Sequence, residues 1–117
     1  MALQLDIQGR VLIAAPEGEL DHYQAERIRT QIDTSLEKPT CKHLVLDMGK
    51  VSFMDSSGIG MIIGRYKKAE TRGGQMILAN MDERVERLFE ISGLAKILKR
   101  TKTVKDAVDM LGGGSNE

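Results

Sequence analysis

The sequence has little of what marks several common classes of protein. Its 117 residues include one cysteine, no tryptophan, two phenylalanines and two tyrosines. With Cys41 alone, no internal disulfide forms. With so few aromatic rings, the chain lacks the side chains on which proteins that bind RNA or single-stranded DNA stack the bases. The longest apolar run is interrupted at Gly64 and Arg65, short of the roughly 20 residues that cross a bilayer. We therefore expect neither a membrane nor a nucleic acid as a partner.

An excess of charge of one sign is also absent. The 17 Lys and Arg residues balance 17 Asp and Glu residues, so no positive field attracts the phosphates of a nucleic acid. Residues 1–6 lack the basic and apolar blocks of a signal peptide. Apolar residues make up 41% of the chain and charged residues 29%, which is ordinary for a globular protein. These features predict a cytoplasmic protein that folds as one monomeric unit.

The apolar residues that are present predict several strands. Leu3, Leu5 and Ile7 alternate with polar neighbours, and a denser apolar run follows a turn at Gly9 and Arg10, which together indicate a hairpin. Later apolar runs are typical of strands that are covered on both faces in a parallel sheet. The predicted strands lie near residues 3–7, at 11–15, at 43–48, at 75–79 and at 97–98.

Capping residues and helical spacing predict about four helices between these strands. The predicted starts are Asp21 with Gln24, then Asp55 or Ser56, then Asn80 with Glu83, and finally Thr103 with Asp106. The alternation favours an α/β fold, a mostly parallel mixed sheet of about five strands covered by helices. We expect one domain over residues 1–111, followed by a flexible C-terminal tail at 112–117.

The segment from Val51 to Gly60 carries the most distinctive chemistry. It joins a predicted buried strand to a helix, and in parallel α/β sheets such loops lie at the carboxyl ends of strands, where ligands and partners bind. Asp55 or Ser56 is expected to cap the helix. A cap does not explain Ser57, because Gly58 after it lowers helix propensity. Local chemistry therefore leaves open a special role for the Ser57 hydroxyl.

Other constellations favour structural interpretations. Gly58, Gly60 and Gly64 do not have the spacing of a dinucleotide-binding turn, and close helix packing explains glycines here. Cys41 and His43 lack the second pair of ligands that a zinc site needs. We expect no cofactor and no metal.

A serine hydrolase would use Ser57 as nucleophile, with His22 or His43 as base. His43 begins the strand that precedes Ser57 and is expected at the opposite edge of the sheet. His22 is more simply a solvated residue of a first helical turn. We therefore expect no enzyme activity, and keep a serine-dependent hydrolase as the alternative from another class.

Two stretches of sequence carry a resemblance to a known family. Gly18-Glu19-Leu20-Asp21-His22 and the later Ser52–Gly60, with its Asp55-Ser56-Ser57-Gly58 core, resemble the STAS-domain anti-sigma factor antagonists. The segments listed next are similar to sporulation members of that family: Gly64–Lys67, Gly74–Met76 and Arg87–Leu94. The resemblance extends from about residue 3 to residue 111, and it implies the single STAS domain described above.

The resemblance also implies a partner-switching mechanism. The serine that matches Ser57 is phosphorylated by the anti-sigma factor, a serine kinase that itself binds the ATP. Unmodified antagonist binds this kinase and releases the sigma factor. The phosphorylated form is inactive until a serine phosphatase removes the phosphate.

Two predicted parallel strands, at 11–15 and 43–48, would bring the loops after them to one edge of the sheet. We expect partner-binding residues there, with Met54 as an adaptable apolar contact. They are Glu19, Asp21, Met54, Asp55, Ser56 and Ser57. Two further alternatives are a STAS regulator of another stress-response pathway and a STAS module that works beside a transporter.

Overall fold

The computed structural model describes residues 3–112. Within this range it contains six strands, four α-helices and one short 3₁₀ helix, in an order that confirms the predicted α/β fold. The elements are β1 (Leu3–Gln8), β2 (Val11–Leu20), α1 (His22–Leu36), β3 (His43–Asp47), β4 (Lys50–Met54), α2 (Ser56–Thr71), β5 (Met76–Ala79), α3 (Glu83–Ile91), η1 (Leu94–Lys96), β6 (Lys99–Thr101) and α4 (Val104–Met110).

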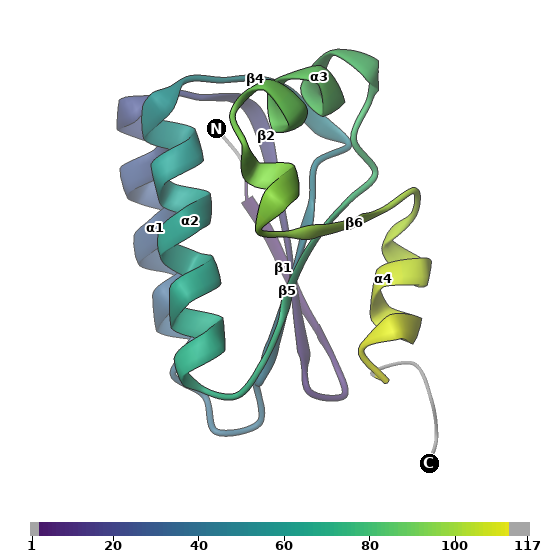
Figure 1. The fold of residues 1–117 in the computed structure, drawn as a ribbon. Coiled ribbons are helices and arrows are strands. Elements are labelled where there is room, and N and C mark those ends of the chain that lie inside the picture. Colours follow the sequence, from purple (N-terminus) through teal and green to yellow (C-terminus); the bar gives the residue numbers. More distant parts are fainter. Residues whose placement is uncertain (1–2, 113–117) are drawn as a thin grey trace.

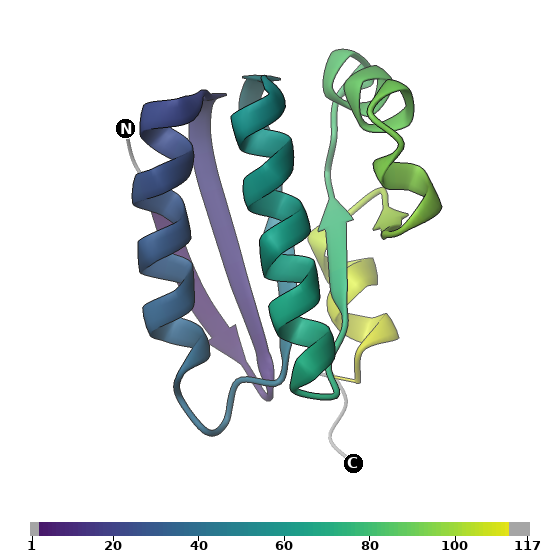
Figure 2. The same ribbon diagram turned by 60° about the vertical axis from the view of Figure 1, so that its left-hand side comes forward.

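The sheet is mixed and mostly parallel, as predicted. Its order is β1-β2-β3-β5-β6, and β4 pairs with the second half of β2. Only β1 is antiparallel to its neighbour. Helices α1 and α2 lie side by side on one face, and α4 lies on the other (Figures 1 and 2). The carboxyl ends of β2 and β4 therefore lie beside each other, directly before α1 and α2.

The apolar runs are buried on both faces because helices cover both sides of the sheet. Along β2, Leu12 and Ala14 belong to the large core under α1 and α2. The alternate residues Val11 and Ile13 belong to the smaller core under α4. Side chains of a pleated strand alternate between its two faces with a period of two. Strand β2 is therefore anchored in a core on each face of the sheet.

Three strand predictions need correction. β2 extends beyond Ala15 to Leu20, and residues 50–54, predicted as a loop, form strand β4. The sequence of β4 does not show the apolar pattern of a strand, because only Val51 and Met54 along it are buried. β4 also lies outside the main strand order and pairs with β2. The predicted strand at 97–98 is instead β6, two residues later. Leu98 is buried in the core, whereas β6 itself is three polar residues held by backbone pairing to β5.

The start of α3 also differs from the prediction. Asp82 is the N-cap, and its side chain accepts a hydrogen bond from the Val85 amide at 2.9 Å. Asn80 instead adopts a left-handed conformation, with φ at 65°, and its side chain donates to Asp47. An asparagine tolerates this conformation better than most residues, so the sequence signal for a cap was a signal for a turn.

The remaining helix starts agree with their predicted caps: Asp21, Asp55 and Thr103 each accept a backbone N–H of the first turn. The predicted tail lies outside the described residues except for Gly112. In the part of the chain from 3 to 112, no helix has the length and apolar character needed to cross a membrane.

Candidate functional site

The candidate site is formed where the first turns of α1 and α2 meet. Asp21 caps α1, and its carboxylate accepts the Gln24 amide at 2.9 Å. Asp55 caps α2, and its Oδ1 accepts the amides of Ser57 at 2.8 Å and Gly58 at 3.1 Å. Each cap satisfies backbone donors that a helix start leaves unpaired. The capped starts of α1 and α2 therefore lie close enough for their side chains to make contact.

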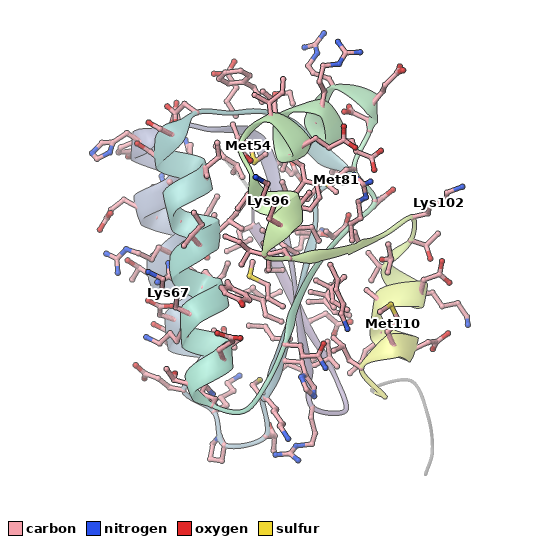
Figure 3. The ribbon with its side chains drawn as sticks, in the orientation of Figure 1. Met54, Lys67, Met81, Lys96, Lys102 and Met110 are labelled. Atoms are coloured by element: carbon pink, nitrogen blue, oxygen red, sulfur yellow. The ribbon has the colours of Figure 1, made fainter. Side chains whose placement is uncertain are left out.

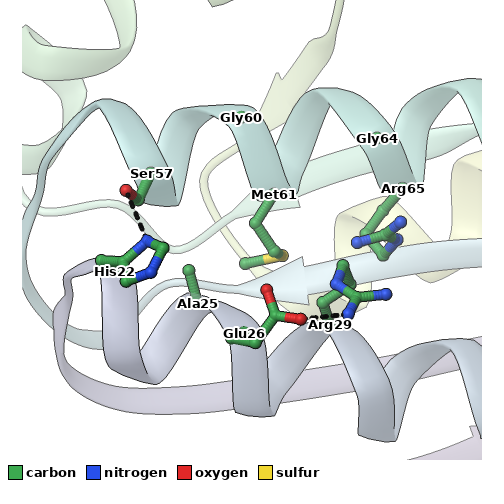
Figure 4. A pocket seen from close by; sticks show the side chains of 9 residues that line it. All are labelled: His22, Ala25, Glu26, Arg29, Ser57, Gly60, Met61, Gly64 and Arg65. Carbon is green, nitrogen blue, oxygen red and sulfur yellow. Dashed lines mark hydrogen bonds and ion pairs between the residues drawn. The ribbon is translucent and has the colours of Figure 1, made fainter.

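Ser57, in the first turn of α2, makes contacts with the starts of both helices. Its backbone is held by Asp55, whereas its hydroxyl points across to α1, where Oγ lies 3.4 Å from Nδ1 of His22 (Figure 4). Ser57 is half-buried and its neighbour Ser56 is exposed. The hydroxyl of Ser57 is therefore oriented, and this orientation comes from tertiary structure rather than from the helix alone.

Gly58 brings α2 close to β2. A Cβ at position 58 would lie 2.5 Å from the carbonyl oxygen of Leu20 and 2.8 Å from its Cβ, distances that real side chains do not adopt. The first turn of α2 consequently packs directly on the end of β2. Packing against Leu20 thus requires a glycine after Ser57. This explains why a residue of low helix propensity stands in the first turn of α2.

A hollow of about 380 Å³ runs between α1 and α2 from this point. Gly60 and Gly64 leave it open, since a Cβ at either position would meet nothing within 4 Å. Its lining residues are His22, Ala25, Glu26, Arg29, Ser57, Gly60, Met61, Gly64 and Arg65 (Figure 4). The hollow is polar at its rim and is floored by Ala25 and Met61, both buried.

The charged groups of the hollow are already paired. Arg29 forms an ion pair with Glu26, and the hydrogen bond from Arg29 is the main reason why the pKa of Glu26 lies below its usual range. Arg65 lies 2.9 Å from Asp33 through its Nε. Burial lowers the pKa of the Arg65 guanidinium, and the Asp33 carboxylate opposes that shift. The Arg65–Asp33 pair joins α2 to α1, whereas the Arg29–Glu26 pair lies within α1.

Most of the predicted partner-binding residues lie at this end of the sheet. Glu19 is exposed and stands opposite Phe53 in the register of β2 and β4. Asp21, Asp55, Ser56 and Ser57 occupy the starts of the two helices. The topology therefore brings together residues that are distant in sequence.

Met54 is the exception and corrects the prediction. Its side chain is 2% exposed and belongs to the main core, near α3 (Figure 3). Because β4 is a strand, Phe53 and Met54 point to opposite faces, and Phe53 is the one that is 43% exposed. Tyr23, on the first turn of α1, is another exposed aromatic residue, at 64%. The apolar residues Val51, Phe53 and Met54 do not alternate strictly with polar ones, so the sequence gives no clear indication of which face of this strand is inward.

The structure does not favour a hydrolase here. A serine nucleophile needs free amide donors for the oxyanion, but Asp55 occupies the amides of Ser57 and Gly58. His43 lies at the start of β3, at the opposite end from Ser57, and its Nδ1 accepts the Gln75 amide at 3.0 Å. Among residues 3–112, no group of His, Cys, Asp and Glu side chains is arranged to hold a metal ion.

Comparison with known proteins agrees with this architecture. Residues 2–107 match the family model of the STAS domain. An anti-sigma F factor antagonist from Paenibacillus polymyxa is 41% identical over 100 residues, which cover 84% of this chain and 86% of that relative.

Two solved structures are similar over almost the whole chain. The unphosphorylated anti-sigma factor antagonist SpoIIAA has 29% identity and a TM-score of 0.75, covering 96% of this chain and 99% of that one. The phosphorylated form of SpoIIAA, a Bacillus cell fate determinant, has 33% identity and a TM-score of 0.72, covering 93% and 98%. The chain therefore belongs to the STAS domain family, in the group formed by the anti-sigma factor antagonists.

Proposed function

We propose that this antagonist is a phosphorylation switch whose modified residue is Ser57. In the unmodified state it binds an anti-sigma factor that is also a serine kinase, so that the sigma factor is released. The kinase binds the ATP and transfers phosphate to Ser57, and a serine phosphatase reverses the change. The observation that carries this proposal is the oriented Ser57 hydroxyl at an exposed helix start, in a chain similar to a protein solved in both states.

Phosphorylation at Ser57 changes charge more than shape. A phosphate adds about −1.5 to −2 charge at pH 7. The helix start tolerates this anion, since its dipole favours negative charge there. A docked kinase, by contrast, would bury the phosphate on an acidic surface that includes Asp21 and Glu19, and taking an added charge out of water costs free energy that a single neighbouring cation offsets only in part. The modification therefore weakens docking and leaves the fold in place.

The surface around Ser57 is the proposed docking surface. It consists of Glu19, Asp21, Phe53, Asp55, Ser56 and Ser57, with Phe53 in the place first given to Met54. Acidic side chains surround an exposed aromatic ring, which fits a partner with basic residues around an apolar pocket. We expect the free protein to be a cytoplasmic monomer, with this surface uncovered.

The direct test is to locate the phosphate. Incubation with the cognate kinase and ATP, followed by mass spectrometry, should give one phosphate on Ser57. Ser57→Ala should accept none, and Ser56→Ala is the matched control, expected to be modified like the wild type. Modification of Ser57→Ala to the wild-type extent would refute the assignment of Ser57.

The docking surface has its own test. Glu19→Lys reverses an exposed charge without touching a helix cap, so kinase affinity measured by calorimetry should fall. Lys105→Glu, on α4, makes a reversal of the same size on the opposite face of the sheet and should leave affinity unchanged. The opposite ranking of these variants would place docking at α4.

The identity of the partner separates this proposal from its closest alternatives. A pull-down from the native cell lysate should recover a small ATP-binding kinase. A multi-subunit stress-response complex would instead indicate a different partner-switching pathway. A transporter would indicate a regulatory module of transport.

A further inference from the structure

The contact between His22 and Ser57 is set by two independent helix starts. His22 is the first residue of α1 and Ser57 the second of α2, and the two are 35 positions apart in sequence. Asp21 fixes one helix start and Asp55 the other through hydrogen bonds to backbone amides. The imidazole Nδ1 is consequently held 3.4 Å from the hydroxyl oxygen that would carry the phosphate.

The other cations of the hollow are engaged elsewhere. Arg29 pairs with Glu26, and Arg65 pairs with Asp33. No ion pair joins His22 to a carboxylate within residues 3–112. The imidazole is therefore the basic group beside Ser57 that forms no ion pair with an acidic side chain, although its charge acts weakly on Glu26.

The acidic side chains near this contact already have hydrogen-bond partners of their own. Asp21 and Asp55 flank it, but both carboxylates accept backbone amides. Glu26, one turn along α1 from His22, is held by Arg29. A new anion on Ser57 would thus meet His22 before it meets an uncompensated carboxylate.

The hollow also provides room for a larger group at Ser57. Gly60 follows one turn later on α2, and a Cβ there would meet nothing within 4 Å. The hollow of about 380 Å³ begins at Ser57 and His22 and continues past Gly60. The hollow therefore leaves open space beside the imidazole for a larger group on Ser57.

We propose that His22 is the intramolecular counter-ion of phosphorylated Ser57. The protonated imidazole donates a hydrogen bond to a phosphate oxygen, and each charge favours the other because opposite charges at this distance attract. This inference rests on the phosphorylation of Ser57 proposed above. Its consequence is that the phosphate stays dianionic to lower pH and is held against the antagonist, in a defined position at the docking surface.

An experiment that needs no kinase tests this. Phosphoserine is incorporated at position 57 during translation, and the phosphate is titrated by ³¹P NMR from pH 4.5 to 8.5, a range chosen around its ordinary second ionisation near pH 6. Removing the cation by His22→Gln should raise the midpoint by about 0.2–0.7 pH unit, the effect of one exposed ion pair. The difference should shrink in about 1 M salt, which screens exposed charges.

His43→Gln is the matched control, because His43 lies at the other end of the sheet and should leave the phosphate midpoint unchanged. Equal midpoints for wild type and His22→Gln would overturn the inference, as would an equal shift in the His43 variant. The ring ¹⁵N resonances of His22 in the wild-type chain, with and without the phosphate, give a second measurement that does not depend on a variant's folding. Unchanged resonances on phosphorylation would also overturn it.

The two proposals fail in different ways. If the kinase does not modify Ser57, the switch is refuted, but the titration of the encoded phosphoserine still reports on His22. If the titration shows no role for His22, kinase and phosphatase reactions at Ser57 remain as proposed.

Discussion

Gly58 is the residue whose size decides how closely α2 packs against the end of β2. Its backbone lies against Leu20 at the end of β2, where a side chain would overlap the carbonyl oxygen. Ser57 depends on that seating, because its hydroxyl reaches His22 only when the first turn of α2 lies close to α1. The absence of a side chain at Gly58 therefore helps to fix the position of the Ser57 hydroxyl.

Replacing Gly58 by alanine should lower the free energy of unfolding by about 1–3 kcal/mol, the usual cost of forcing atoms into a packed site. Gly60→Ala is the matched control on the same helix. Its Cβ meets nothing within 4 Å, and alanine has the better helix propensity by up to about 1 kcal/mol, so stability should stay the same or rise. Urea unfolding followed by circular dichroism measures both, and equal losses would show that packing at Leu20 is not the cause.

At the scale of elements, a partly buried ion network joins α1 to α2. Asp33 on α1 lies 2.9 Å from Arg65 and within 4 Å of Arg29 and Lys68. The side chains of Arg65 and Asp33 are 9% and 16% exposed. Burial makes the loss of one partner costly, because the other charge is left without compensation.

Asp33→Ala should therefore destabilise the protein by about 1–3 kcal/mol or more. Asp109→Ala is the matched control: it removes the same side chain from an ion pair with Lys105 at the same 2.9 Å, but both partners are exposed. Exposed i,i+4 pairs contribute roughly 0.3–0.5 kcal/mol. Thermal or urea unfolding compares the two, and a similar small loss for both would mean that the Asp33 network is no stronger than a surface pair.

His43 links the starts of β3 and β5 and makes stability depend on pH. Its Nδ1 accepts the Gln75 amide, which requires an unprotonated nitrogen. Burial, then Lys42 and Arg10, lower the pKa of His43. The unfolded chain therefore binds this proton more readily than the folded chain. The contribution is complete above the unfolded value near pH 6.5 and is lost as pH falls below it.

Unfolding free energies of wild type and His43→Gln at pH 7.5 and pH 5.5 check this expectation. The wild type should lose more stability between the two values than the variant, because the variant has no imidazole to protonate. A larger loss in the variant would contradict the sign of the shift.

At the scale of the whole molecule, the sheet and its helices act as a rigid base for one exposed end. Both cores lie on the sheet, and the proposed docking surface lies at the carboxyl ends of β2 and β4. Ser57 itself belongs to neither core. The modified and unmodified states should accordingly share one fold.

Ser57→Asp should imitate phosphorylation only in part, since a carboxylate supplies one charge where phosphate supplies up to two. The melting temperature should stay close to that of the wild type, because the helix start stabilises a negative charge. Kinase affinity should fall about tenfold or more, equivalent to at least roughly 1.4 kcal/mol. Calorimetry gives both values. A large fall in melting temperature would make Ser57 a structural residue, and wild-type affinity would remove it from the interface.

Local patterns predicted much of the fold because local physics decides it. Asp21, Asp55 and Thr103 cap helices as expected, since a short polar side chain satisfies the first amides wherever it stands before a helical run. The strands β3 and β5 could be predicted because each contains a continuous apolar run. β4 and β6 did not, because short strands with polar positions are specified by backbone pairing to a neighbour.

The sequence by itself determined the α/β order, the family resemblance and the choice of Ser57, each of which depends on residue types at fixed spacing. Only the tertiary structure decided that Met54 is buried while Phe53 is exposed, that Gly58 is required against Leu20, and that His22 contacts Ser57. These facts depend on which face of a strand is covered and on how two helix ends meet across 35 residues of chain. Packing sets those distances, and no local pattern records them.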